Sequence, residues 1–236
     1  MKNTLTIFRR ELGSYFNSPI GYIVITVFLL FSGWLFFDRV FLYGEASVRG
    51  YLELTPLIFV FFCPAVTMRL LAEEKRTGTI EYLITMPVSD WQVVLGKFFA
   101  ALAVIAVAVL LTLAYPLTLD RFGDMDWGVV FGGYLGLLLM GGAYIAVGLA
   151  ASSWTRDQVV SFIVAFGITF SLFLLGQLLP LMPAALRPVL GYLSVHTHFE
   201  NLSKGVIDLR DLVYYASLIV ACLFLAVQSL DSRRWR

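Results

Sequence analysis

Residues 73–97 read EEKRTGTIEYLITMPVSDWQVVLGK, and this charged stretch separates two of the most apolar segments of the chain. Six charged residues fall between positions 69 and 81: Arg69, Glu73, Glu74, Lys75, Arg76 and Glu81. Each charged side chain costs about 2.5 to 3.5 kcal/mol at the centre of a bilayer, whereas a leucine contributes only about half a kcal/mol. A membrane span over this stretch is therefore excluded, and the sequence predicts a polar hairpin, residues 69–97, between two spans.

The rest of the chain has the composition of a polytopic membrane protein. Of its 236 residues 59% are apolar and 14% are charged, against roughly 25% charged residues in a soluble domain. Apolar runs recur that are long enough to cross a hydrocarbon core of about 30 Å. We expect a single all-α domain over residues 1–236 with six transmembrane helices, at about 20–37, 55–70, 98–119, 127–151, 159–179 and 212–230, and a polar loop over 38–54.

The first residues predict a helix that lies in the membrane interface. Leu5, Phe8, Leu12 and Tyr15 or Phe16 recur at helical spacing on one face, and charged residues lie off that stripe. Such a pattern is typical of an amphipathic interfacial helix, here over residues 1–18. The alternative is a short lead-in segment in the cytosol.

Six spans place both termini on one side of the membrane, and the basic residues indicate which side. Cytoplasmic loops of membrane proteins are enriched in lysine and arginine. Eleven of the seventeen lysines and arginines lie on the side of the termini and the hairpin: Lys2, Arg9, Arg10, Arg69, Lys75, Arg76, Lys97, Arg156, Arg233, Arg234 and Arg236. Both termini are therefore expected in the cytoplasm.

The first half of the hairpin predicts a helix that continues the second span. Arg69–Glu73 and Glu73–Arg76 have the i,i+4 and i,i+3 spacings at which opposite charges pair on a helix. Gly78 is expected to end this helix. Ser89 and Gln92 have the spacing of a capping box, which predicts the start of the helix that enters the third span.

The second half predicts a short helix from Thr79 to Pro87, with Glu81 in its first turn. Its apolar side chains Ile80, Leu83 and Ile84 share one face. An apolar face on a short helix outside the membrane is typical of a docking surface for another protein. On periodicity alone, a helix lying flat on the lipid interface is an equal alternative.

The hairpin resembles a known family in its residue pattern, Glu73-Glu74-Lys75-Arg76-x-Gly78-Thr79-x-Glu81-x-Leu83-x-x-x-Pro87. This pattern resembles the signature loop of ABC-2 type permease subunits of ABC transporters. The segments FRRELGSYFNSPIGYIV, PAVTMRLLAEEKRTGTIEYLIT, VVLGKF and HFENLSKGVIDLRDLVYY extend the likeness over the whole chain. In these segments the chain is similar to the gliding-motility-associated, GldF-like permeases.

The resemblance implies that the hairpin carries a coupling helix seated in a groove of a separate ATP-binding subunit. Ile80, Leu83 and Ile84 would be its buried anchors, and Glu73, Glu74, Arg76 and Glu81 would form ion pairs at the rim. The implied partners are a dimer of ATP-binding subunits, a second permease subunit that is identical or related, the lipid bilayer of a bacterial inner membrane, and an auxiliary periplasmic or membrane subunit. Nucleic acid is not among them.

The sequence itself supports a separate ATPase. It has no G-x-x-x-x-G-K-[ST] loop, and its one Gly-Lys pair, Gly96-Lys97, is followed by Phe98. We therefore expect no enzyme activity and no cofactor in this chain, with ATP and Mg²⁺ bound by the partner.

Residues 180–210 are too rich in prolines for a simple span. They predict one or two short re-entrant helices on the outer side, or plain packing over the span ends, with Asp208 or Asp211 capping the sixth span. His196 and His198, with Glu200 nearby, form an H-x-H pattern, which is weak evidence for zinc without a clear third ligand.

The fourth span carries small residues at helical spacing: Gly132, Gly136, Gly141, Gly142, Ala146 and Gly148. Small residues let helices approach closely, so this face predicts either a packing seam within the chain or a subunit interface.

Other classes of function fit less well. A secondary transporter or an intramembrane enzyme usually needs ionisable groups inside its spans, and the spans contain almost none. A permease-like subunit with a mechanical or signalling role remains open beside a transporter that exports a solute.

Overall fold

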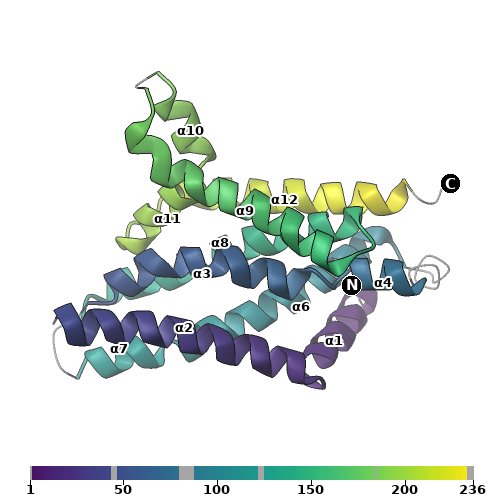
Figure 1. The fold of residues 1–236 in the computed structure, drawn as a ribbon, viewed down its shortest axis with the longest axis horizontal. Helices are drawn as coiled ribbons and strands as arrows, with labels where there is room; N and C mark the ends of the chain where they lie inside the picture. Colours follow the sequence, from purple (N-terminus) through teal and green to yellow (C-terminus); the bar gives the residue numbers. More distant parts are fainter. Residues whose placement is uncertain (1, 44–46, 80–87, 122–124, 184, 233–236) are drawn as a thin grey trace.

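The computed structural model describes residues 2–43, 47–79, 88–121, 125–183 and 185–232, and every regular element in these ranges is a helix. Six helical segments are long and apolar enough to cross a membrane, which confirms the predicted all-α fold. Their cores are α2 (Pro19–Tyr43), α3 (Arg49–Thr67), α6 (Asp90–Leu111), α8 (Trp127–Trp154), α9 (Gln158–Leu178) and α12 (Leu209–Asp231). Together they form an elongated bundle (Figure 1).

The polar loop expected over residues 38–54 is largely helical, which corrects that prediction. Helix α2 continues to Tyr43, and α3 already begins at Arg49. Val48, Tyr51 and Leu52 are almost completely buried. The charged residues of segment 38–54 suggested a loop. Burial of these three apolar side chains in the bundle instead extends helix α3 toward its start.

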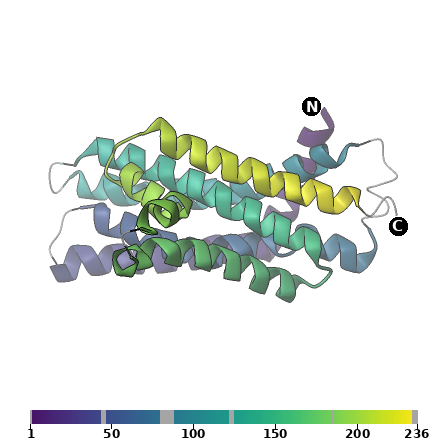
Figure 2. The ribbon, with the colours of Figure 1, turned by 90° about the horizontal axis from the view of Figure 1, so that it is seen from above.

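Helix α8 is the centre of the bundle and contacts α3, α6, α9, α11 and α12. Helices α9 and α12 flank it on opposite sides (Figure 2). Its glycines allow close approach: a Cβ atom on Gly148 would lie 2.0 Å from Thr67 Oγ1, and one on Gly132 would lie 2.5 Å from the Leu202 carbonyl oxygen. The small residues of the fourth span therefore form a packing seam within the chain.

Helix α1 (Lys2–Phe16) packs along the first half of α6. The two helices are closest at Gly96, where an added Cβ atom would lie 2.8 Å from Ile7 Cγ2. Of the predicted apolar stripe, Tyr15 is buried and Phe8 and Leu12 are partly buried, whereas Leu5 is half exposed. The helix itself is confirmed, and its position in the membrane interface remains a prediction.

Short helices occupy the connections. Helix α4 (Ala72–Thr77) follows α3, and α7 (Ala114–Leu119) extends α6. Between α9 and α12 lie η1 (Leu179–Leu181), α10 (Arg187–Leu193) and α11 (Val195–Ser203). Helix α10 projects from the bundle and lies beside the last part of α9 (Figure 1), whereas α11 packs against α8, α9 and α12. The predicted short helices of residues 180–210 are therefore present.

We call the end of the bundle that carries α4 the hairpin end, and the end that carries α10 and α11 the opposite end. Helix α1 and the C-terminal end of α12 both lie at the hairpin end (Figure 1). An even number of spans explains this shared position.

Candidate functional site: the hairpin end

The structure places half of the predicted coupling residues at the start of the hairpin. Glu73, Glu74 and Arg76 lie on α4, and Gly78 ends that helix in the left-handed conformation, with φ of 73°. This backbone conformation favours glycine, so the predicted helix stop is confirmed. Thr79 follows it and is exposed. The remaining predicted residues lie outside the described ranges: Ile80, Glu81, Leu83, Ile84 and Pro87.

The hairpin returns to the bundle at α6, whose start has the predicted capping box. Ser89 Oγ accepts a hydrogen bond from the Gln92 backbone N–H at 3.3 Å, and the Gln92 side chain accepts one from the Ser89 backbone N–H at the same distance. This cap fixes where the hairpin ends and the third span begins.

The second span does not continue unbroken into α4, which corrects the prediction of one helix from Arg69 to Arg76. Helix α3 ends at Thr67, and a turn leads into α4 at Ala72. Ser152 Oγ at the end of α8 accepts hydrogen bonds from the backbone N–H groups of Leu71 (3.1 Å) and Ala72 (3.0 Å). Because these bonds replace intrahelical partners, the chain can turn here without leaving both donors unpaired.

Helix α4 is also attached to the end of α8 by a side-chain hydrogen bond. The buried Lys75 Nζ donates to the Ser153 carbonyl oxygen, which also accepts a hydrogen bond of 2.8 Å from Ser229 Oγ of α12. One carbonyl oxygen thereby joins α4, α8 and α12.

A buried lysine is the electrostatic centre of the hairpin end. Lys97 is 1% exposed, and its Nζ lies 2.9 Å from Glu11 Oε1 and 2.8 Å from Glu74 Oε1. These charge-assisted hydrogen bonds connect α1, α4 and α6. The second oxygen of Glu74, Oε2, is buried and has no hydrogen-bond partner among the described residues.

The sequence interpretation assigned Glu74 to the rim of a partner contact and gave Lys97 no structural role. The sequence did indicate that Lys97 needs a partner. A lysine next to a long apolar run is expensive to bury unless an acidic group pairs with it. What the sequence did not contain was the identity of that acidic group.

Arg69 also makes different contacts from those predicted. Its Nη2 donates to Ser14 Oγ at 2.9 Å, and its guanidinium lies 5.1 Å from the centre of the Tyr15 ring. Tyr15 in turn donates a hydrogen bond of 2.7 Å to the Val66 carbonyl oxygen. The expected helical ion pair of Arg69 with Glu73 is replaced by a tie between α1 and the end of α3.

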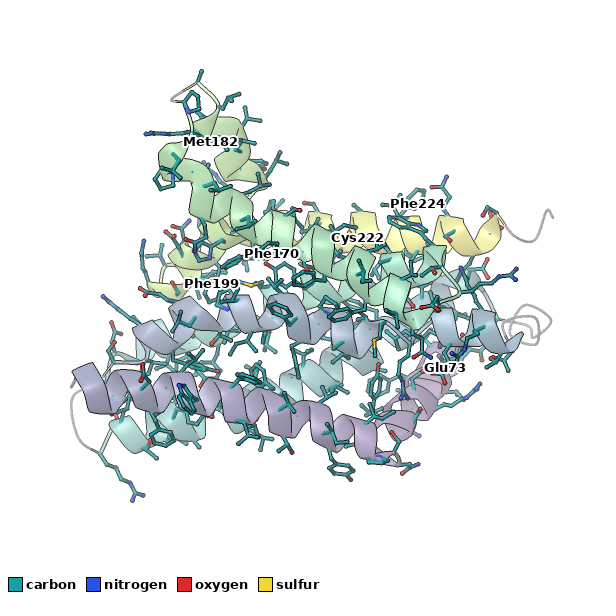
Figure 3. The ribbon with its side chains drawn as sticks, viewed as in Figure 1. Glu73, Phe170, Met182, Phe199, Cys222 and Phe224 are labelled. Carbon is teal, nitrogen blue, oxygen red and sulfur yellow. The ribbon has the colours of Figure 1, made fainter. Side chains whose placement is uncertain are left out.

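These groups surround a polar hollow of about 250 Å³ behind the hairpin. Figure 3 labels Glu73 at this end of the bundle. The hollow is lined by Arg10, Glu11, Ser14, Arg69, Leu70, Glu73, Glu74, Thr77, Thr79 and Lys97. Charges of both signs around it are suited to polar contacts with a partner or with water.

The two histidines at the opposite end do not share a site. They lie on a helix rather than the strand that the zinc pattern requires, so residues two apart point in different directions. His198 Nδ1 lies 2.6 Å from Asp211 Oδ1, whereas His196 Nε2 lies 3.1 Å from Gln177 Nε2. No group of three or more potential metal ligands occurs in the described ranges.

The cap of the sixth span distinguishes its two candidate aspartates. Asp208 is the N-cap of α12, with Oδ1 2.9 Å from the Arg210 backbone nitrogen. Asp211 instead is buried and pairs with His198.

Comparison with protein families gives a match over residues 18–230 to the family described as ABC-2 family transporter protein. This chain belongs to the ABC-2 family. The match covers all six apolar helices and the whole hairpin. The ABC-2 chain is accordingly a membrane component of a transporter.

Two curated relatives agree with this assignment. The ABC-2 chain is 28% identical, over 149 residues, to the probable multidrug ABC transporter permease YbhR of Escherichia coli K12 and to the protein of the same name from Escherichia coli O157:H7. Each alignment covers 60% of this chain and 38% of the relative. The chain thus spans well under half of the length of the curated relatives it matches.

Proposed function

We propose that this chain is the permease subunit of an ATP-driven exporter and that hairpin 69–97 is its coupling element. The observation that carries the proposal is the buried contact of Lys97 with Glu11 and Glu74. It joins the hairpin to the first helix of the chain and to the third span. A movement imposed on the hairpin by a partner would therefore reach several spans together.

The way α4 is anchored supports this role. Ser152 holds the turn before α4, and Lys75 holds α4 itself to the end of α8. Helix α8 contacts most of the other spans. Because packed helices move as units rather than deform continuously, a push on α4 would be passed on to the centre of the bundle.

We propose further that the hairpin end faces the cytoplasm, where the ATP-binding subunits are. The excess of basic residues in the segments at this end supports that orientation. The assembly we propose contains two permease subunits, identical or related, and two ATP-binding subunits. An auxiliary subunit is a further proposed partner. We propose that the permease is of the GldF-like type.

For the cargo we propose an apolar or amphipathic compound. The described spans offer few Asp, Glu, Lys or Arg side chains, and the two of these that are most deeply buried, Lys97 and Asp211, lie at the two ends of the bundle and are paired. The name of the Escherichia coli relatives, a probable multidrug permease, agrees with such a cargo.

The decisive experiment identifies the ATPase that would drive transport. The tagged chain is expressed in its native host, purified in mild detergent and analysed for co-purifying ATPases. A variant with Glu73→Ala, Leu83→Ala and Ile84→Ala tests the hairpin, and Arg210→Ala, exposed at the opposite end, is the matched control. We expect the wild type and the control to retain an ATP-binding subunit and the hairpin variant to lose it.

Three outcomes would count against the proposal. Retention of the ATPase by the hairpin variant would remove the coupling role. Transport that persists without an ATPase and collapses with an ion gradient would instead favour a secondary transporter. ATPase binding without movement of any solute would favour the mechanical or signalling role.

A further inference from the structure

An apolar groove of about 610 Å³ runs between α1 and α6 on the outside of the bundle. Its walls are almost entirely hydrocarbon: Thr4, Leu5, Phe8, Leu95, Phe99, Leu102, Ala103 and Ala106. Leu5 is 50% exposed and Phe99 is 46% exposed. No segment in the described ranges covers the groove.

The length of the groove matches one leaflet of a membrane. Its α6 wall extends from Leu95 to Ala106, which is about 16 Å at a rise of about 1.5 Å per residue. The hydrocarbon core of a bilayer is about 30 Å thick, so that one leaflet measures about 15 Å. Because α6 is a membrane-spanning helix, the groove lies along the direction in which acyl chains extend.

A positive charge follows the α1 wall of the groove, on the same side of the helix as Leu5, since residues four apart are neighbours on a helix. Arg9 follows Phe8 on α1 and is exposed. Its charged neighbours have other roles: Arg10 lines the hollow behind the hairpin, and Glu11 pairs with Lys97. The groove therefore has an almost entirely hydrocarbon lining, with an exposed cation next to it on α1.

We propose that this groove binds one anionic phospholipid of the leaflet at the hairpin end. One acyl chain lies between α1 and α6, and the phosphate lies beside Arg9. The cation next to the groove and a groove length of one leaflet favour a lipid as the occupant over the side of a second copy of the chain. The small side chains of Ala103 and Ala106 leave the space that the acyl chain fills. This inference is independent of the proposed transport function.

The test uses the full chain, purified in detergent, stripped of lipid and titrated with dioleoyl phosphatidylglycerol, with bound lipids counted by native mass spectrometry. Ala103→Phe fills the groove. Val107→Phe adds the same ring to an exposed position outside the groove and is the matched control. We expect Ala103→Phe to bind about tenfold more weakly, as when about two methylene groups lose their apolar contacts, and Val107→Phe to bind as the wild type does.

A second variant guards against misfolding of the first. Leu5→Gln makes one wall of the groove polar at a half-exposed position of α1, and it is expected to weaken binding without lowering the melting temperature. Arg9→Gln tests the headgroup contact. It is expected to abolish the preference for dioleoyl phosphatidylglycerol over dioleoyl phosphatidylcholine.

The proposal is overturned if Ala103→Phe and Leu5→Gln both bind phosphatidylglycerol as tightly as the wild type does. It is also overturned if Ala103→Phe converts a dimer to a monomer while lipid binding is unchanged, because the groove would then be a contact between copies. Equal affinity of the wild type for both lipids would remove the role of Arg9 and the anionic headgroup.

Discussion

The two ends of the bundle each contain a buried charge cluster, and the clusters differ in how completely their polar atoms are paired. At the opposite end, His198 contacts Asp211 Oδ1 through Nδ1 (2.6 Å) and the Tyr192 carbonyl oxygen through Nε2 (3.1 Å). Asn201 donates to Asp211 Oδ2 at 3.1 Å. At the hairpin end, Lys97 bridges two carboxylates, but Glu74 Oε2 has no partner among the described residues.

The different pairing of the two clusters indicates what each cluster is suited to do. A fully paired buried network fixes one arrangement of the segments that it joins. At the opposite end it holds α11 onto the start of α12. A buried oxygen without a partner leaves a capacity for one more hydrogen bond, and at the hairpin end this oxygen lies in a cluster beside a polar hollow. The His198–Asp211 cluster is therefore suited to a structural clamp, whereas the Lys97 cluster keeps one buried acceptor, Glu74 Oε2, without a partner among the described residues.

The largest effect is expected when the bridging cation at the hairpin end is removed. Lys97→Met leaves Glu11 and Glu74 close together without their counter-charge, and breaking a buried ion pair in this way costs about 3 to 5 kcal/mol. A clear fall in melting temperature in detergent is expected. Adding Glu11→Gln and Glu74→Gln to Lys97→Met should recover most of the loss. Unchanged stability of Lys97→Met alone would show that the cluster does not hold this end.

A somewhat smaller effect is expected at the opposite end. Asp211→Asn removes the charge that pairs with His198 and is expected to lower stability by about 1.5 to 3 kcal/mol, the range for hydrogen bonds to charged groups. Local opening is measured as the rate of trypsin cleavage after the exposed Lys204, in the turn between α11 and α12. Asp208→Asn is the matched control, since asparagine and aspartate are equally good N-caps. Equal cleavage rates in both variants would argue against a clamp.

Each end also has a close contact between helices at a glycine. Replacing these glycines by alanine predicts a smaller difference in stability between the two ends. Gly132→Ala at the opposite end would press a Cβ atom against the Leu202 backbone oxygen, whereas Gly96→Ala at the hairpin end would meet the side chain of Ile7. The contact at Gly132 is the shorter one, 2.5 Å from a backbone atom, whereas at Gly96 the nearest atom is Ile7 Cγ2 at 2.8 Å, which can rotate, followed by Ile7 Cβ at 2.9 Å, which cannot. We expect Gly132→Ala to cost about 1 to 3 kcal/mol and Gly96→Ala to cost less, as measured by thermal unfolding. The reverse order would mean that the hairpin end is the more tightly packed.

The smallest expected effect is a dependence of stability on pH at the opposite end. Burial lowers the pKa of His196 from its usual 6.5, and this is opposed by the negative charges of Glu200 and Glu53. The unfolded chain therefore binds this proton more readily, so stability falls as the pH drops through about 6.5. His196→Gln removes this dependence. Melting temperatures at pH 7.5 and 5.5 should differ less in the variant than in the wild type, and an equal difference would contradict the assignment.

Local patterns in the sequence were sufficient for several parts of the hairpin. The capping box of Ser89 and Gln92 and the helix stop at Gly78 were predicted correctly because each depends on residues within four positions of one another. The continuous helix through Arg69 was wrong, because its interruption depends on Ser152, which is 81 positions from Leu71 in the chain. No local pattern contains that contact.

The sequence by itself determined the class of the protein. Long apolar runs have to become helices, because only a helix pairs its own backbone groups inside a bilayer, and the charges between Arg69 and Glu81 have to lie outside it. Only the tertiary structure decided which charges meet. Lys97 needs an acidic partner wherever it is buried, but its partners Glu11 and Glu74 lie 86 and 23 positions away. Their selection depends on how α1 and α4 pack against α6, and that packing is determined by the shapes of the whole bundle.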